Sequence, residues 1–184
     1  MKPKQRLDIV SRVYLDVDVY EAALQRIEWV FSEFEHVYAD ISGGKDSTVI
    51  YHLALEVAEK LGRLPLDVLF IDQEAEWASV IDYIRQLMAD PRVRPHWLQC
   101  PIRIFNATSH RTEWLMCWEE GAEWMREKEP DSVHANTFGT MRFAELYGAF
   151  LRTRHPTGSA AHLAGVRCEE SPGRRLGLTT CETY

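Results

Sequence analysis

Residues 42–48 have the composition of a loop that binds phosphate groups. They read Ser-Gly-Gly-Lys-Asp-Ser-Thr and lie between a short apolar run, 37–41, and a stretch with helical spacing that begins at Thr48. A glycine pair allows the backbone to turn tightly and to direct consecutive N–H groups toward one point. The helix that follows adds roughly half of a positive elementary charge at its N-terminus, which favours an anion there. We therefore predict that this segment holds the phosphates of a nucleotide.

The side chains of this segment add specific chemistry. Lys45 contributes a positive point charge, and the remaining hydroxyl side chains can donate hydrogen bonds to phosphate oxygens; these are Ser42, Ser47 and Thr48. Asp46 is the odd member, because a carboxylate beside phosphates is repelled unless a cation intervenes. Its presence indicates either a bound Mg²⁺ ion or a structural bond from Asp46 to the loop backbone.

The segment is not a Walker A loop. Ala39 occupies the place of the first glycine of that loop, and Asp46, instead of Ser or Thr, follows Gly44 and Lys45. An alternative interpretation is that the glycines only form a turn and that Ser47 only caps a helix. The combination of a tight turn, hydroxyl groups and a lysine after a buried strand favours phosphate binding.

Apolar periodicity predicts the elements that must position this loop. Helical spacing occurs in four stretches: 19–34, 48–61, 80–88 and 140–151. Apolar runs predict four strands: 37–41, 66–71, 96–104 (interrupted by Pro101) and 161–166. Such alternation predicts an α/β fold with an open, mainly parallel sheet and helices on both faces.

The length of the chain, 184 residues, suits one sizeable core and is too short for two comfortable domains. We predict a single nucleotide-binding domain over residues 1–184. Residues 109–139 are rich in Trp and Glu and follow no single period, which predicts an insertion, part helix and part loop. The chain stops soon after its last predicted strand, which indicates a missing C-terminal region.

Composition excludes several classes of function. The formal net charge of −7 argues against strong intrinsic binding of nucleic acid, because such binding rests on many Lys and Arg contacts to phosphates. Residues 1–14 contain no continuous apolar run, so we expect no secretory signal, no membrane partner and a cytoplasmic location. The four cysteines lack CxxC spacing, which disfavours a disulfide framework or a structural metal site.

The loop resembles the PP-loop of the adenine nucleotide alpha-hydrolase superfamily, which includes ATP pyrophosphatases and phosphoadenosine phosphosulfate (PAPS) reductases. Residues 68–72 (Val-Leu-Phe-Ile-Asp), followed by Glu-Ala-Glu at 74–76, resemble the second-strand motif of PAPS reductase relatives. Residues 165–171, with Arg174, resemble their late Gly-Ile-Arg, Glu-Ser, Arg motif.

Further along the chain, residues 98–107 with the nearby Trp114, Cys117 and Trp118 are similar to the IbrA-like branch of the PAPS reductase family. Altogether the likeness spans about residues 20–184. It implies a five-stranded parallel sheet of the PP-loop type, with the nucleotide at the carboxyl ends of the strands.

The resemblance also implies roles for individual residues. The end of the second strand, from Phe70 to Asp72, should approach the adenosine. Arg167 and Arg174 should clamp a second phosphate or sulfate group, because a planar guanidinium matches such oxygens, and Glu170 should orient one of them. An exposed basic turn is the alternative interpretation of these arginines. The complete set of expected nucleotide-binding residues is Ser42, Gly43, Gly44, Lys45, Asp46, Ser47, Thr48, Phe70, Ile71, Asp72, Arg167, Glu170 and Arg174.

Two functional hypotheses follow. The first is an enzyme that binds ATP or a PAPS-like adenine nucleotide with Mg²⁺ and cleaves the α–β phosphate bond to activate a substrate. Lys45 and Asp46 would be its catalytic residues, with Lys45 stabilising the leaving pyrophosphate and Asp46 holding Mg²⁺. The second, implied by the IbrA-like branch, is a regulatory nucleotide-binding module that acts with a ParB-like protein partner.

A true sulfonucleotide reductase is disfavoured. Such reductases carry their reactive cysteine in a Glu-Cys-Gly-Leu/Ile-His tail, whereas residues 180–184 read Thr-Cys-Glu-Thr-Tyr. The cysteines do not form the clustered pairs that hold an iron–sulfur cluster, so we expect no such cluster. For Cys168 and for Trp77, just beyond the second strand, structural roles are favoured over a catalytic thiol and a stacking group, respectively.

Overall fold

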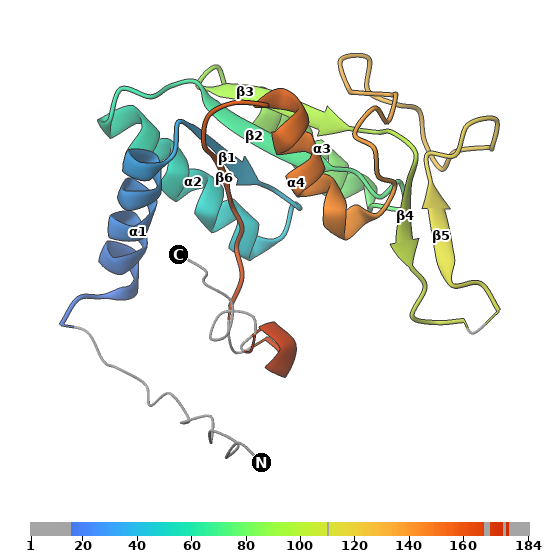
Figure 1. The fold of residues 1–184 in the computed structure, drawn as a ribbon, viewed down its shortest axis with the longest axis horizontal. Helices are drawn as coiled ribbons and strands as arrows, with labels where there is room; N and C mark the ends of the chain where they lie inside the picture. Colours follow the sequence, from blue (N-terminus) through green and yellow to red (C-terminus); the bar gives the residue numbers. More distant parts are fainter. Residues whose placement is uncertain (1–15, 110, 168–169, 175, 177–184) are drawn as a thin grey trace, which may run out of the picture.

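The computed structural model describes residues 16–109, 111–167, 170–174 and 176. Its central sheet contains four parallel strands in the order β3–β2–β1–β6 (Figure 1). The bounds of these strands are β1 His36–Asp40, β2 Leu66–Ile71, β3 Val93–Leu98 and β6 Ala160–Leu163. The four labelled helices are α1 Val19–Glu33, α2 Lys45–Lys60, α3 Ala78–Met88 and α4 Phe143–Arg154. The predicted α/β class with a mainly parallel sheet is confirmed.

Helices cover both faces of the sheet because the strand side chains alternate between two apolar cores. On one face, Val37 and Ala39 of β1 pack with buried residues of α1, α2 and α3. On the other face, Tyr38 of β1 packs with Leu146 and Phe150 of α4. Strands buried on both faces read as near-continuous apolar runs, which explains why β1 and β2 were visible in the sequence.

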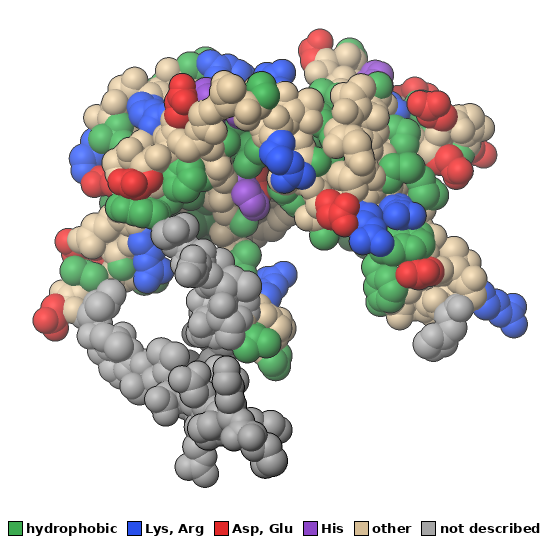
Figure 2. Space-filling model, viewed as in Figure 1, with side chains coloured by type: hydrophobic (Ala, Val, Ile, Leu, Met, Phe, Trp, Pro, Cys, Tyr) green, Lys and Arg blue, Asp and Glu red, His purple; other side chains and the backbone are tan. Residues whose placement is uncertain are grey.

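A separate antiparallel hairpin projects from the end of the sheet beyond β3 (Figure 1). It consists of β4 (Ile102–Phe105) and β5 (Trp114–Cys117). Hydrophobic side chains gather on this hairpin (Figure 2), where Phe105 is 65% and Leu115 45% exposed.

Three expectations from the sequence need correction. The described sheet has four strands instead of five. The predicted strand 96–104 is two strands, because the chain leaves the sheet after Leu98 and Pro101 cannot donate a ladder hydrogen bond. Helix α2 begins at Lys45, earlier than predicted, with Gly44 as its N-cap.

The insertion also differs from its prediction. Within residues 109–139, the described part contains strand β5, turns and loops, and no helix. The backbone of this segment forms hydrogen bonds with the main body of the protein instead of within a helix. The Gln99 amide donates to the Val133 carbonyl at 3.0 Å, and the Val133 amide donates to the Trp97 carbonyl at 2.8 Å. Tertiary contacts therefore determine the shape of this segment.

The parallel arrangement brings the carboxyl ends of the strands to one edge of the sheet. Strand β6 pairs with β1 in parallel register, with His162 opposite Tyr38. The segment that follows β6 therefore leaves the sheet on the same side as the loop that follows β1. Among the helices of the described residues, none has the length and apolar character needed to cross a membrane.

Candidate functional site

The turn between β1 and α2 is shaped by its two glycines. Gly43 has φ of +72°, a left-handed conformation that glycine adopts without strain. A Cβ at Gly43 would lie 2.6 Å from Cγ1 of Val80 in α3, so the turn is packed directly against that helix. Gly44 is the N-cap of α2 and offers no side-chain hydrogen bond to the first turn. The N-terminal end of this helix therefore has no side-chain acceptor at its cap, which suits an anion.

Hydroxyl groups brace the turn from inside. The Ser42 amide donates to Oγ of Ser47 at 3.1 Å, and the Ser47 hydroxyl donates to the Gly44 carbonyl at 3.0 Å. The Thr48 hydroxyl donates to the same carbonyl at 2.9 Å. Ser47 is buried. Ser47 and Thr48 thus hold the loop in shape, so the structural interpretation of these two hydroxyls has direct support.

The charged residues of the loop lie nearer to solvent. The Lys45 side chain is 75% exposed, and its Nζ lies 3.9 Å from Oδ1 of Asp46. The Nε of Arg167, from the segment after β6, lies 3.2 Å from Oδ2 of Asp46. Arg167 therefore supplies a cation beside the Asp46 carboxylate, a partner that the sequence analysis did not assign to Asp46.

The donor set around Asp46 allows one mode of Mg²⁺ binding. The described residues contain no group of three or more His, Cys, Asp or Glu residues that could hold a metal ion. Mg²⁺ in nucleotide sites is commonly bound by one or two carboxylates together with substrate phosphates. Asp46, with a side chain 29% exposed, fits that shared mode and does not form a protein-only metal site.

Gly165 allows the late segment to cross the loop. A Cβ at this position would lie 2.6 Å from the carbonyl carbon of Asp46 and 2.8 Å from the amide nitrogen of Ser47. Real side chains do not approach a backbone so closely, so this crossing requires glycine. The segment after β6 is therefore in direct contact with the first turn of α2.

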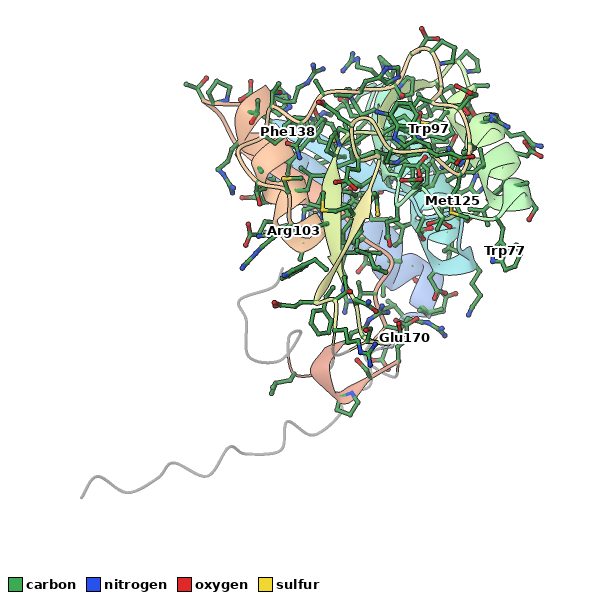
Figure 3. All side chains as sticks on the ribbon, turned by 90° about the vertical axis from the view of Figure 1, so that its right-hand side faces the viewer. Trp77, Trp97, Arg103, Met125, Phe138 and Glu170 are labelled. Carbon is green, nitrogen blue, oxygen red and sulfur yellow. The ribbon has the colours of Figure 1, made fainter. Side chains whose placement is uncertain are left out.

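A small ion-pair network extends from this crossing. Arg167 lies 3.4 Å from Oε1 of Glu170, and Arg174 pairs with Oε2 of the same carboxylate. Glu170 lies on the segment below the main body of the molecule (Figure 3). The structure thus joins Arg167, Glu170 and Arg174 to the loop side of the sheet, whereas Cys168 lies outside the described residues.

The end of β2 differs from its expected role. Phe70, Ile71 and Asp72 are 2%, 3% and 0% exposed. Phe70 packs its ring against Trp97 with centroids 5.3 Å apart, and Ile71 belongs to the core under α4. These side chains face the protein interior, so a contact of this strand end with adenosine would have to come from backbone groups.

Asp72 is held by residues that sequence reasoning did not select. Its Oδ2 accepts hydrogen bonds from Trp97 Nε1 at 2.8 Å and Gln99 Nε2 at 3.0 Å. The Arg126 guanidinium, from the insertion, lies 2.5 Å from Oδ1 of Asp72. The fully buried Trp118 donates from Nε1 to the Asp72 carbonyl at 2.9 Å. The carboxylate after a buried strand was the available signal, since a buried charge requires partners.

A second buried carboxylate lies at the end of β1. Asp40 is 7% exposed, and its Oδ2 lies 2.5 Å from Nδ1 of His162 in β6. Its Oδ1 has no hydrogen-bond partner among the described residues. Burial raises the pKa of the Asp40 carboxyl against the opposing effect of His162, and the hydrogen bond that His162 donates to Asp40 raises the pKa of His162. Tyr147 stacks on His162 with ring centroids 5.5 Å apart.

Three cavities among the described residues lie away from the loop, and the smallest, of about 200 Å³, is lined by Pro65 and Arg94. One of about 610 Å³ is lined by Trp29 and Leu61, between α1 and the end of α2. Another of about 600 Å³ is lined by Met116 and Asn136, beside the hairpin. On the face shown in Figure 2, Lys and Arg side chains alternate with Asp and Glu side chains and form no single basic patch.

Comparison with known proteins relates this chain to one protein family. Residues 36–179 match the family described as phosphoadenosine phosphosulfate reductase domain. The chain is 31% identical over 180 residues to the uncharacterized protein YbdN of Escherichia coli (strain K12), a match that covers 93% of this chain and 44% of that protein. The chain therefore spans less than half the length of that relative.

A shorter match involves proteins named sulfate adenylyltransferase subunit 2. Identity is 39% over 72 residues with the protein of Mycolicibacterium vanbaalenii, and 42% over 72 residues with that of Mycobacterium tuberculosis (strain ATCC 25618 / H37Rv). Each match covers 39% of this chain and 23% of the relative. No solved structure matches the chain.

Proposed function

The chain belongs to the phosphoadenosine phosphosulfate reductase domain family, and from this premise we propose that residues 42–48 bind the phosphates of ATP or a PAPS-like nucleotide. The observation that carries the proposal is the meeting of two distant segments at the N-terminus of α2. Gly165 packs on the backbone of Asp46, and Arg167 pairs with the Asp46 carboxylate. Backbone amides, a helix dipole and two cationic side chains thus converge on one small region.

Each residue has a defined task in the proposed complex. The loop amides and the first turn of α2 contact one phosphate group, in a shape that Ser47 and Thr48 maintain. Lys45 is exposed and only loosely paired with Asp46, so it can turn toward a phosphate oxygen. Arg167 approaches from the opposite segment, and Glu170 keeps Arg174 close to it.

Asp46 would hold Mg²⁺ jointly with phosphate oxygens. The ion, when bound, neutralises part of the negative charge of the phosphates. In that arrangement Arg167 would exchange the carboxylate of Asp46 for a phosphate oxygen, which a guanidinium binds with comparable geometry. The partly exposed side chains of both residues permit this exchange.

Adenylyl transfer is the reaction class that we propose for the site. Proteins named sulfate adenylyltransferase subunit 2 share a 72-residue region with this chain, which supports this class. An acceptor oxygen would form a bond to the α-phosphorus while the bond to the α–β bridging oxygen breaks, and pyrophosphate leaves with that electron pair. Lys45 and the loop amides would stabilise the charge on pyrophosphate.

The described thiols are poor candidates for the attacking group. Burial raises the pKa of Cys100 and of Cys117 to about 11. At neutral pH both are therefore protonated thiols, whereas the thiolate is the nucleophile. The acceptor thus comes from a substrate or from a partner in this proposal.

The alternative function is regulatory: nucleotide binding without turnover, in the cytoplasm, together with a ParB-like partner. Calorimetric titration of ATP and of PAPS, with and without Mg²⁺, tests the binding step. An assay for pyrophosphate release from ATP then separates the two functions. Binding with release supports the enzyme, and binding without release supports the regulatory module. Failure of both nucleotides to bind contradicts the proposed function.

A further inference from the structure

Trp77 is an exposed indole at the start of α3, the helix that packs against Gly43 of the phosphate loop. Its side chain belongs to the residue that precedes α3, and the residue is 81% exposed. By contrast, Trp97 and Trp118 are buried in the cores. An indole carries a large apolar surface, and leaving it in water forgoes the free energy of its burial. Packing among the residues that the structure describes therefore does not account for Trp77.

Trp77 is the N-cap of α3, and this helix packs against the phosphate loop. The Trp77 carbonyl accepts hydrogen bonds from the amides of Val80 at 2.9 Å and Ile81 at 3.1 Å, so these residues form the first turn of α3. Val80 is the residue that packs against Gly43. One helical turn, with a pitch of about 5.4 Å, thus separates Trp77 from the side chain that contacts the phosphate loop.

The backbone that carries Trp77 is fixed. The Glu74 amide donates to Oδ1 of Asp72 at 2.8 Å, and the Glu76 amide donates to the Glu74 carbonyl at 2.9 Å. The Glu74 carboxylate in turn accepts the amide of Met125 at 3.0 Å. Figure 3 shows Trp77 and Met125 on the same side of the molecule, with Trp77 projecting outward. A fixed backbone and a side chain with two rotatable bonds lower the entropic cost of binding a flat ligand.

We propose that Trp77 is the stacking platform for the base of the nucleotide. This inference rests on the proposed function, because it requires the phosphates to occupy residues 42–48. An aromatic ring one helical turn from Val80, the residue that packs against Gly43, can receive the base, which the ribose separates from the phosphates. Stacking on an aromatic side chain tolerates different bases, because every base has a π-face. The platform thus contributes affinity and does not by itself select adenine.

The test compares a nucleotide with a ligand that has no base. Dissociation constants for ATP, GTP and inorganic tripolyphosphate are measured for the wild type, Trp77→Ala and Trp77→Phe. We expect Trp77→Ala to lower the affinity for ATP and GTP roughly 5-fold to 100-fold, as for loss of one stacked base. The affinity for tripolyphosphate should be unchanged. Trp77→Phe should retain most of the affinity. The matched control is Trp29→Ala on α1, at the cavity away from the loop.

The outcomes separate this inference from the proposed function. If the wild type binds neither ATP nor tripolyphosphate, the proposed function fails and the platform fails with it. If ATP binds equally to the wild type and Trp77→Ala, only the platform is wrong. An equal loss of affinity for ATP and for tripolyphosphate in Trp77→Ala would also overturn the stacking platform, because Trp77 would then act by shaping the loop. Quenching of tryptophan fluorescence by ATP should be smaller in Trp77→Phe than in Trp29→Phe.

Discussion

Arg167 and Asp46 form an ion pair across the candidate site, with Nε of Arg167 3.2 Å from Oδ2 of Asp46. The two residues belong to segments that follow different strands, β6 and β1. Their contact depends on the parallel pairing of these strands, which places both carboxyl ends at one edge. The late segment is therefore part of the loop's immediate surroundings and is not an independent basic turn.

Lys45→Ala should weaken ATP binding roughly tenfold to a hundredfold, because a hydrogen bond to a charged group contributes about 1.5 to 3 kcal/mol. The fold should persist, since the side chain is 75% exposed. Lys60→Ala, at the far end of the same helix, is the matched control. Calorimetric titration measures both, and equal dissociation constants for the wild type and Lys45→Ala would contradict the phosphate-loop assignment.

Arg167→Ala should reduce nucleotide affinity by a similar factor, because it removes the cation that reaches the loop from the segment after β6. Arg167→Lys should recover only part of the affinity, since an ammonium cannot form the bidentate contact. Arg94→Ala serves as the control, because Arg94 pairs with Asp67 across β3 and β2, away from the loop. A retained affinity in Arg167→Ala would exclude Arg167 from the binding site.

Gly165→Ala should damage both stability and binding. The new Cβ would meet the backbone of Asp46 at 2.6 Å, and neither backbone can rotate away as a side chain would. Overpacking of this kind typically costs about 1 to 3 kcal/mol. Gly173→Ala is the control, because its Cβ would approach nothing closer than 3.9 Å. Denaturant unfolding and ATP titration are the two measurements. Wild-type values in both would contradict the close contact between Gly165 and the backbone of Asp46.

Arg126→Ala should destabilise the fold by about 3 to 5 kcal/mol, because it leaves the fully buried Asp72 carboxylate without its counter-ion. Lys128→Ala removes a neighbouring cation that contacts the Trp124 ring and should cost far less. Combining Arg126→Met with Asp72→Asn should restore part of the loss. Urea unfolding measures all three, and an equal cost for Arg126→Ala and Lys128→Ala would show that the ion pair has no special weight.

Stability should fall as the pH rises through the raised pKa of His162. The folded pKa lies above the unfolded value of about 6.5, so the contribution of the Asp40–His162 pair is complete below that pH. It is lost as His162 deprotonates in the folded state. The raised pKa of Asp40 acts with the same sign, because the folded state also holds that proton more tightly.

The variant His162→Gln has no titrating group at this position, so it lacks the pH dependence of stability that His162 causes. It serves as the reference. The difference in melting temperature between the wild type and His162→Gln should shrink between about pH 6 and pH 8. His155, whose pKa burial lowers, contributes with the opposite sign but equally in both proteins, so the difference cancels it. A constant difference across this range would mean that folding does not raise the pKa of His162.

Much of this architecture could be predicted where local pattern and tertiary structure agree. Strand β2 has the predicted bounds, 66–71, because both of its faces are buried and its residues form a continuous apolar run. The turn at Gly43 could be predicted because its backbone has a φ of +72°, which glycine adopts without strain. The contact of Arg167 with the loop followed from the family resemblance and from parallel strand order, which together place the two segments at one edge.

Other features were hidden because they depend on partners far apart in the sequence. The burial of the Asp72 carboxylate follows from how Trp118 and Arg126 of the insertion close over the end of β2, and no local pattern reports that closure. The Asp40–His162 contact needs β1 and β6 to be neighbours, which neither sequence segment indicates by itself. The insertion lacked a period because its order comes from contacts with other segments.

The bonds between the insertion and the end of β2 restrict how the protein can be shortened or recombined. Domain boundaries for expression are normally chosen where few contacts cross, and loops of variable sequence are normally the first to be trimmed. Here deletion of the segment around Trp118 and Arg126 would expose the Asp72 carboxylate. It would also remove the Arg126 guanidinium that pairs with this carboxylate and the Trp118 N–H that donates to the Asp72 carbonyl. We therefore expect this segment to be required for folding. Chimeras with relatives of this family should exchange the end of β2 and the insertion together.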